Sequence, residues 1–146
     1  MTNKVVFLKP GNNTSFRLIP FGLLVMGSYL DKHKLNVKII DSSIKMDYDS
    51  IIKEIEDELI VGLSVNTYEV PSALEISKYI KAHSKTPVLW GGMHPTLYPE
   101  QTIASEYIDY IAYNEGDETV LELATNLMEN KNVDIIARGE SEYTFV

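Results

Sequence analysis

Small polar residues and glycines that could bind a ligand follow two of the apolar runs in this sequence. Ser64, Asn66 and Thr67 come at the end of one run, and their hydroxyl and amide groups can hydrogen-bond a buried polar ligand. Gly91 and Gly92 follow another run, and without Cβ atoms they let a bulky planar ligand approach the backbone closely. Each pattern also has a purely structural interpretation, because Thr67 can cap a helix and a glycine pair can form a tight turn.

Ionisable residues occupy the same kind of position. His94 follows the glycine pair and could act as a ligand or acid–base group, although a lone loop histidine is more commonly a surface or capping residue. Glu115 and Gly116 belong to an acidic stretch at the start of an expected helix, where the helix dipole favours negative charge. Paired carboxylates can also do acid–base chemistry in a cleft. No spacing singles out a catalytic set or a metal site, so we assign no catalytic or metal-ligating residue.

The loop after the first apolar run, residues 9–15, contains Pro10 and Gly11. It has neither the Gly-rich, lysine-terminated pattern of a P-loop nor the three-glycine fingerprint of dinucleotide-binding proteins. ATP hydrolysis and classical NAD binding are therefore disfavoured. The loop either reverses the direction of the chain or lines a ligand cleft.

The overall composition excludes several classes of function. The chain has 146 residues, enough for one domain with its own core, and contains no cysteine. It cannot supply a disulfide, a thiolate zinc site, a cysteine nucleophile or a cysteine-held iron–sulfur cluster. A net charge of −8 disfavours nucleic acid as a partner, because phosphates would be repelled. The first apolar run is too short for a signal peptide or a membrane span, and the sequence fits a cytoplasmic protein.

Short apolar runs alternate with helical patterns along the chain. The runs expected to form strands are residues 5–8, 36–40, 59–65, 87–90 and 107–113. Residues 21–30 are apolar nearly all round, which predicts a buried helix. The alternation favours a three-layer, doubly wound α/β fold with a five-stranded, mostly parallel sheet. The flavodoxin-like strand order 2-1-3-4-5 is preferred to the Rossmann-like order, and ligands should bind beyond the carboxyl ends of the strands.

Five segments resemble, in order, the motifs of one known family. They are residues 19–24 with 29–30, 37–41, 61–67, 88–96 and 108–119. The fourth contains Gly-Gly-Met-His-Pro-Thr, and the fifth contains Glu-Gly-Asp-Glu-Thr. The family is the N-terminal cobalamin (vitamin B12)-binding domain of cobalamin-dependent radical S-adenosylmethionine (radical SAM) enzymes, and the resemblance extends from about residue 4 to residue 128.

The resemblance implies a role for each loop. Cobalamin would bind with its nucleotide tail between the sheet and a flanking helix. Ser64, Asn66 or Thr67 would hydrogen-bond the tail, and the glycine pair would allow its close approach. The full set of candidate cofactor-binding residues is Pro10, Gly11, Gly22, Ser64, Asn66, Thr67, Gly91, Gly92, His94, Glu115 and Gly116.

Two departures from the family patterns refine this expectation. The first loop has no histidine, unlike the wider cobalamin fold, so we expect base-off cobalamin without a histidine ligand from that position. The chain has no cysteines for an iron–sulfur cluster, so the cluster and S-adenosylmethionine would belong to a C-terminal radical SAM domain in the same polypeptide. Residues 1–130 would form the cobalamin-binding domain, and residues 131–146 a linker or first strand toward that C-terminal domain. The chain alone would not be catalytic but would serve methyl transfer or related radical chemistry in the full enzyme.

Two other functions stay open at this point. A domain of the same fold could serve docking or regulation without any cofactor. A flavodoxin-like flavin or nucleotide binder is the second alternative, although the first loop lacks a Ser/Thr/Gly-rich phosphate-binding sequence. A receiver domain is disfavoured, because Ser64, Val65 and Asn66 stand where the phosphorylated aspartate would follow the third strand.

Overall fold

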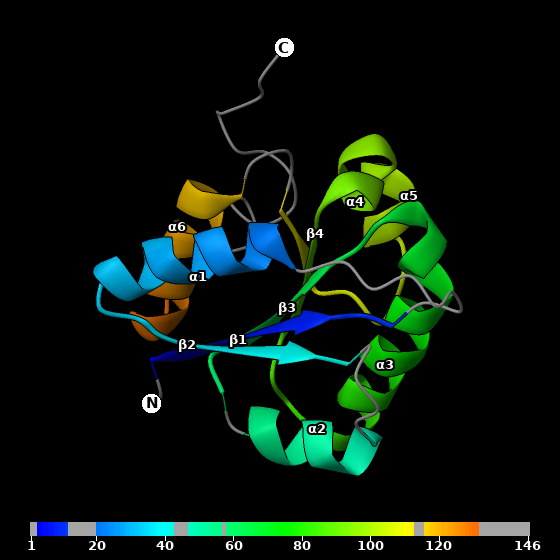
Figure 1. Ribbon diagram of the computed structural model, residues 1–146, viewed down its shortest axis with the longest axis horizontal. Coiled ribbons are helices and arrows are strands. Elements are labelled where there is room, and N and C mark those ends of the chain that lie inside the picture. Colours follow the sequence, from blue (N-terminus) through cyan, green and yellow to red (C-terminus); the bar gives the residue numbers. More distant parts are fainter. Residues whose placement is uncertain (1–2, 12–19, 43–46, 57, 113–115, 132–146) are drawn as a thin grey trace.

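The computed structural model describes residues 3–11, 20–42, 47–56, 58–112 and 116–131 (Figure 1). Its strands are β1 (Lys4–Lys9), β2 (Asn36–Asp41), β3 (Ile60–Ser64), β4 (Val88–Gly91) and β5 (Tyr110–Ile111). Its helices are α1 (Phe21–Lys32), α2 (Tyr48–Ile55), η1 (Thr67–Glu69, a single 3-10 turn), α3 (Val70–His83), α4 (Met93–Leu97), α5 (Pro99–Ile103) and α6 (Asp117–Met128). None of the described helices is long and apolar enough to cross a membrane. The linker or strand expected at residues 131–146 lies, apart from its first residue, outside the described part of the chain.

The strands form one parallel sheet in the order β2-β1-β3-β4-β5. Phe7 of β1 lies in register with Ile39 of β2 on one side and Gly62 of β3 on the other. The expected flavodoxin-like strand order is therefore confirmed. The direction of winding reverses between β1 and β3, and in such folds ligands bind beyond the carboxyl ends of these two strands.

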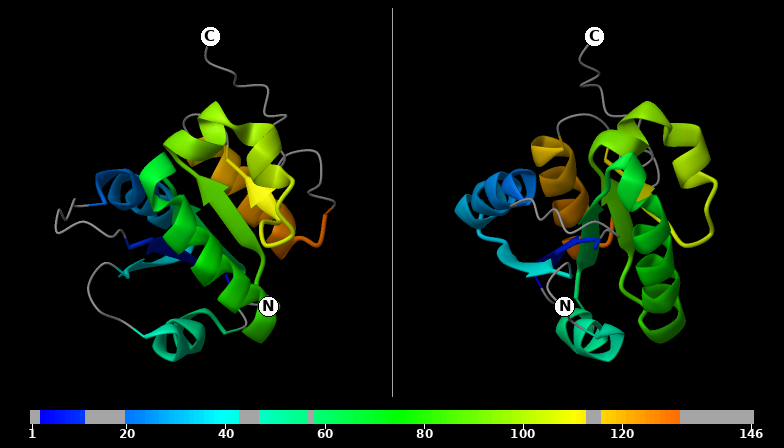
Figure 2. Two further views of the ribbon diagram at one scale, coloured as in Figure 1. Left: turned by 90° about the vertical axis from the view of Figure 1, so that its right-hand side faces the viewer. Right: turned by 45° about the vertical axis from the view of Figure 1, so that its right-hand side comes forward.

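Helices cover both faces of the sheet. Figures 1 and 2 show α1 and α6 on one face, with α2 and α3 on the other. Alternate residues of β1 accordingly enter two separate cores: Val5 and Phe7 join the core with α1 and α6, while Val6 and Leu8 join the core with α2 and α3. Burial on both faces explains why a central strand such as β1 appears in the sequence as a continuous apolar run.

One expectation, that α1 is buried on all sides, is wrong. Leu23, Gly27 and Leu30 are buried, but Phe21 is 69% exposed and Val25 is 58% exposed. An outer-layer helix can bury only the face that meets the sheet, whatever the composition of its other faces. The exposed side chains of Phe21 and Val25 each border one of two cavities described below.

The chain after β4 is more helical than the sequence predicts. Residues 91–96 are expected as a loop, whereas α4 begins at Met93, directly after Gly92. Gly92 has a φ of +97°, a backbone conformation that glycine adopts without steric cost, and it turns the strand sharply into the helix. Pro99 then starts α5, where its fixed φ suits a first helical turn.

The fifth strand is shorter than the run at 107–113 predicts. Among the described residues, only Tyr110 and Ile111 pair with β4. Just before them, the carboxylate of Asp109 accepts a hydrogen bond from the backbone N–H of Val88 at 2.8 Å. A side-chain oxygen here takes the place of the backbone carbonyl that would extend the parallel ladder.

Trp90, the sole tryptophan, is anchored by a buried hydrogen bond. Its indole Nε1 donates to Ser77 Oγ at 3.0 Å, and neither residue is more than 1% exposed. Ser77→Ala would leave the indole N–H buried without a partner, so we expect the free energy of unfolding to fall by about 1–3 kcal/mol. Urea unfolding followed by Trp90 fluorescence measures this loss. The control Lys78→Ala, at an exposed position of α3, should cost less than about 0.5 kcal/mol; equal losses would contradict the prediction.

Candidate functional site

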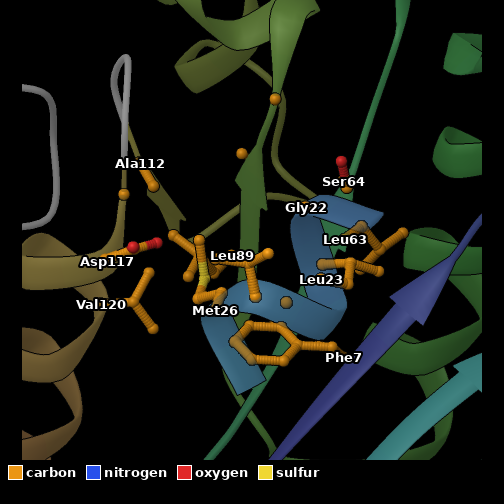
Figure 3. Close-up of a pocket in the computed structure, with 15 residues that line it drawn as sticks. Phe7, Gly22, Leu23, Met26, Leu63, Ser64, Leu89, Ala112, Asp117 and Val120 are labelled. Carbon is orange, nitrogen blue, oxygen red and sulfur yellow. The ribbon is translucent and has the colours of Figure 1, made fainter. Parts of the chain in front are cut away.

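A cavity of about 450 Å³ opens at the carboxyl ends of β1, β3 and β4, between the sheet and the helices α1 and α6 (Figure 3). This volume falls within the range of small-molecule binding sites. The cavity is lined by Phe7, Gly22, Leu23, Val25, Met26, Gly62, Leu63, Ser64, Leu89, Gly91, Gly92, Ala112, Gly116, Asp117 and Val120. It lies where the strand order predicts a ligand site, beside the reversal between β1 and β3.

The inner wall of this first cavity is apolar. Phe7 and Leu89 come from the sheet, and Met26 and Val120 approach from α1 and α6 (Figure 3). The Phe7 ring occupies the space beside Gly62, where an added Cβ would lie 2.9 Å from Phe7 Cδ1. A flat aromatic group entering the cavity would leave water for apolar surroundings, which favours binding.

Polar side chains lie at the rim of the first cavity. Ser64 ends β3, and its hydroxyl projects beyond the strand, while Asp117 starts α6 and directs its carboxylate toward the cavity (Figure 3). A hydroxyl can donate and accept, whereas an ionised carboxylate accepts only. The rim can therefore bind the hydroxyl or amide groups of a ligand whose apolar part fills the interior.

Gly92 keeps the loops after β3 and β4 in close contact. The backbone N–H of Val65 donates to Gly91 O at 2.8 Å, and the N–H of His94 donates to Val65 O at 2.9 Å. A Cβ on Gly92 would lie 3.0 Å from Val65 N and 3.2 Å from Ser64 Oγ. The missing side chain thus lets these loops approach each other and leaves room for the Ser64 hydroxyl.

A second cavity, of about 210 Å³, adjoins the first, since Gly22, Leu23 and Ser64 line both. Its other lining residues are Lys9, Pro20, Phe21, Asn66 and Glu69. The side chains of Lys9 and Glu69 are only 8% and 2% exposed, and Lys9 Nζ lies 3.9 Å from Glu69 Oε2. Two buried charges of opposite sign therefore face each other in this smaller, more polar cavity.

The structure gathers part of the predicted site and leaves the rest outside it. The predicted residues that line the first cavity are Gly22, Ser64, Gly91, Gly92 and Gly116. Asn66 lines the second cavity together with Gly22 and Ser64. Pro10, Gly11, Thr67 and His94 are not among the lining residues of either cavity. Glu115 lies outside the described residues.

The predicted residues away from the cavities have local contacts of their own. His94 is 7% exposed, and its Nδ1 lies 3.3 Å from Thr67 Oγ1. A Cβ on Gly11 would be in ordinary contact with Ser42 O at 3.7 Å, so packing does not require glycine there. Pro10 is buried at the end of β1. The contact between His94 and Thr67 joins the chain after β4 to the chain after β3.

Sequence reasoning missed several lining residues. Gly62 carries a local signal, because a glycine inside an apolar strand indicates a close approach by another group. Lys9 and Glu69 carry none, since a charge at the end of a strand or beside a helix is ordinarily solvated. Only the packing of β1 against the chain after β3 brings these two charges together out of water.

A doubly wound sheet with a cavity at its winding reversal is typical of domains that bind a cofactor or another small molecule. The family model described as B12 binding domain matches residues 10–124. The chain therefore belongs to the B12-binding domain family, as its motifs predicted. None of the curated proteins matches the sequence.

Solved structures of cobalamin enzymes share this fold. TsrM, a radical S-adenosylmethionine methyltransferase from Kitasatospora setae with cobalamin and a [4Fe-4S] cluster bound, has a TM-score of 0.80 and 23% identity, over 90% of this chain and 26% of TsrM. OxsB, a cobalamin-dependent S-adenosylmethionine radical enzyme with aqua-cobalamin and S-adenosylmethionine bound, has a TM-score of 0.78 and 26% identity, over 91% of this chain and 20% of OxsB. The chain thus spans about a quarter of the first enzyme and a fifth of the second.

Proposed function

We propose that this chain is a cobalamin-binding module that works beside a radical SAM domain and catalyses no reaction by itself. The observation that carries the proposal is the first cavity, which is apolar inside and polar at its rim, in a chain of the B12-binding family. When bound, cobalamin supplies methyl-transfer or radical chemistry at its cobalt. The protein's part is to hold the cofactor and to control access to the metal.

The residues of the first cavity suit the nucleotide tail of cobalamin, which ends in a flat aromatic base. Phe7, Leu89 and Val120 provide an apolar surface on which such a base is removed from water. At the rim, Ser64 and Asp117 would hydrogen-bond the polar groups of the tail. The cavity thus combines the two surfaces, apolar and hydrogen-bonding, that this part of the cofactor requires.

The exposed start of α1 would contact the remainder of the cofactor. Phe21 and Val25 are more than half exposed, and each lines one of the two cavities. At Gly22, between these positions, an added Cβ would have nothing within 4 Å, so this side of the helix leaves open space. Apolar side chains beside open space suit a large, amphipathic ligand better than they suit water.

We further propose that the cofactor binds in the base-off form. A base held among Phe7, Leu89 and Val120 is not free to coordinate its own cobalt. In the described part of the chain, no histidine lines either cavity, so we assign no histidine ligand to the metal. The cluster and S-adenosylmethionine would be held by the neighbouring radical SAM domain.

Titration of the protein with hydroxocobalamin and methylcobalamin tests the proposal. Calorimetry should show saturable binding, and the absorption spectrum of methylcobalamin should change from the base-on to the base-off form. Flavin mononucleotide is the matched control, for which we expect no saturation. Binding of the flavin without binding of either cobalamin would overturn the proposal, and so would binding of none of the three.

His94→Ala should leave the absorption spectrum of bound cobalamin unchanged. The His94 ring is buried beside Thr67 and lines neither cavity, so its removal does not alter the surroundings of the cobalt. The measurement compares spectra of the variant and the wild-type protein at saturating protein concentration. A shift of the cobalt absorption bands would show that the histidine is a ligand and would contradict the prediction.

A further inference from the structure

The second cavity contains a buried carboxylate oxygen that lacks a hydrogen-bond donor. We propose that Lys9 and Glu69 form a binding subsite for a primary carboxamide, namely one of the acetamide or propionamide arms on the rim of the corrin ring. This inference rests on the proposed function and extends it from the tail of the cofactor to its ring.

Glu69 is held in place by one of its oxygens and offers the other to the cavity. Its Oε1 accepts a hydrogen bond from the backbone N–H of Asn66 at 3.0 Å. Its Oε2 is enclosed and, among the described residues, is the one buried side-chain polar atom without a hydrogen-bond partner. The ammonium of Lys9, at 3.9 Å, is beyond hydrogen-bond length. Since buried polar atoms are nearly always hydrogen-bonded, this oxygen should receive a donor from a ligand or from a bound water.

The pair of charges selects the chemistry of that ligand. A group that contacts both must accept a hydrogen bond from Lys9 and donate one to Glu69. A carboxylate or phosphate would be attracted by Lys9 but repelled by Glu69, and an ammonium the reverse, so a neutral group that both accepts and donates fits the pair best. A primary carboxamide carries an acceptor oxygen and a donor nitrogen about 2.3 Å apart, as its bond lengths dictate. With that spacing, the carboxamide oxygen can accept from Lys9 Nζ while the nitrogen donates to Glu69 Oε2, which lies 3.9 Å from Nζ.

The position of the pair suits an arm of the same ligand. Lys9 ends β1, and Glu69 lies in η1, the turn that follows β3, so both lie at or beyond the carboxyl ends of the strands between which the winding reverses. Their cavity shares Gly22, Leu23 and Ser64 with the first cavity. A cofactor whose tail fills the first cavity can therefore extend a short polar arm into the second.

The first test measures affinity for cobalamin and for cobinamide, which keeps the carboxamide arms of the ring but lacks the nucleotide tail. The variant is the double substitution Lys9→Met/Glu69→Gln, which removes both charges together so that neither stays buried alone. We expect the double variant to bind both corrinoids more weakly by the same factor, about tenfold or more. The matched control, Val120→Phe in the first cavity, should weaken binding of cobalamin but not of cobinamide.

A second test uses wild-type protein and identifies the arm. In each of a series of cobinamides, one carboxamide is hydrolysed to a carboxylate. One isomer should bind at least about tenfold more weakly than the parent, because its carboxylate would face Glu69, and Glu69→Gln should remove most of that penalty. If every isomer binds wild-type protein as the parent does, water rather than an arm occupies the subsite and the inference is overturned.

The outcomes separate this inference from the proposed function. If the double variant is folded by circular dichroism and binds both corrinoids as tightly as wild-type protein, the subsite is wrong and the cobalamin module stands. If wild-type protein binds neither corrinoid, the proposed function fails and the subsite fails with it. Equal weakening for the two corrinoids, together with one discriminated isomer, supports the subsite.

Discussion

Gly22→Trp should weaken cobalamin binding by about a hundredfold or more while leaving the protein folded. Gly22 lines both cavities, and an added Cβ would have nothing within 4 Å. Met26, four residues later on the same face of α1, also lines the first cavity, so a side chain at position 22 shares that face. An indole there would fill the space that the cofactor needs without touching the core.

Calorimetric titration with hydroxocobalamin measures the effect, and Gly22→Ala is the matched control. A methyl group occupies little of the open space, so the alanine variant should bind within about threefold of wild-type protein. Glycine is costlier than alanine in a helix by about 0.5–1 kcal/mol, so neither replacement should lower the stability of the fold. Tight cobalamin binding by a folded tryptophan variant would show that the cofactor does not lie beside α1.

Gly92→Ala should lower the free energy of unfolding by about 2–4 kcal/mol. A side chain at a φ of +97° is strained, and such strain costs about 1–3 kcal/mol. The added Cβ would also lie 3.0 Å from Val65 N and 3.2 Å from Val65 O, both backbone atoms that cannot move independently. Overpacking of this kind costs a further 1–3 kcal/mol or so. Urea unfolding followed by Trp90 fluorescence measures the loss.

Gly91→Ala is the control for the neighbouring glycine. Its Cβ would meet Ala112 Cβ at 3.5 Å, which is ordinary van der Waals contact, and no positive φ is involved. We therefore expect a change in stability of less than about 1 kcal/mol. Similar losses for the two variants would contradict the argument from backbone conformation. The sequence treats the two glycines alike as positions of close approach, whereas the structure gives only Gly92 of the two a positive φ.

Much of the fold was predictable from local pattern. The continuous apolar run at 5–8 indicated a strand covered on both faces, and the alternation of such runs with helices led to the confirmed order of the parallel sheet. The apolar pattern of α1 led to a wrong expectation of burial, because burial depends on where the helix lies in the fold. The start of α1 is apolar yet exposed, because an outer-layer helix meets the sheet along one face only.

The candidate site was predictable where a residue's type and its position at the end of a strand were enough to suggest contact with a ligand. Ser64 at the end of a strand and the paired glycines after the next strand pointed to a ligand cleft, and all of them line the first cavity. His94 shows the limit of such reasoning, because the sequence places it in the same loop and the structure turns it toward Thr67 instead. The segment expected as a loop contains helix α4, and the direction of the His94 side chain depends on how that helix packs.

The sequence by itself determined the class of fold, the edge of the sheet where the cavities open and, through its motifs, the B12-binding domain family. It could do so because apolar periodicity and glycine placement encode backbone conformation over a few residues. The tertiary structure alone decided that Lys9 and Glu69 meet out of water and that Gly92 rather than Gly91 has a positive φ. These features depend on which strands become neighbours and in what register, and that follows from packing of the whole chain rather than from any local pattern.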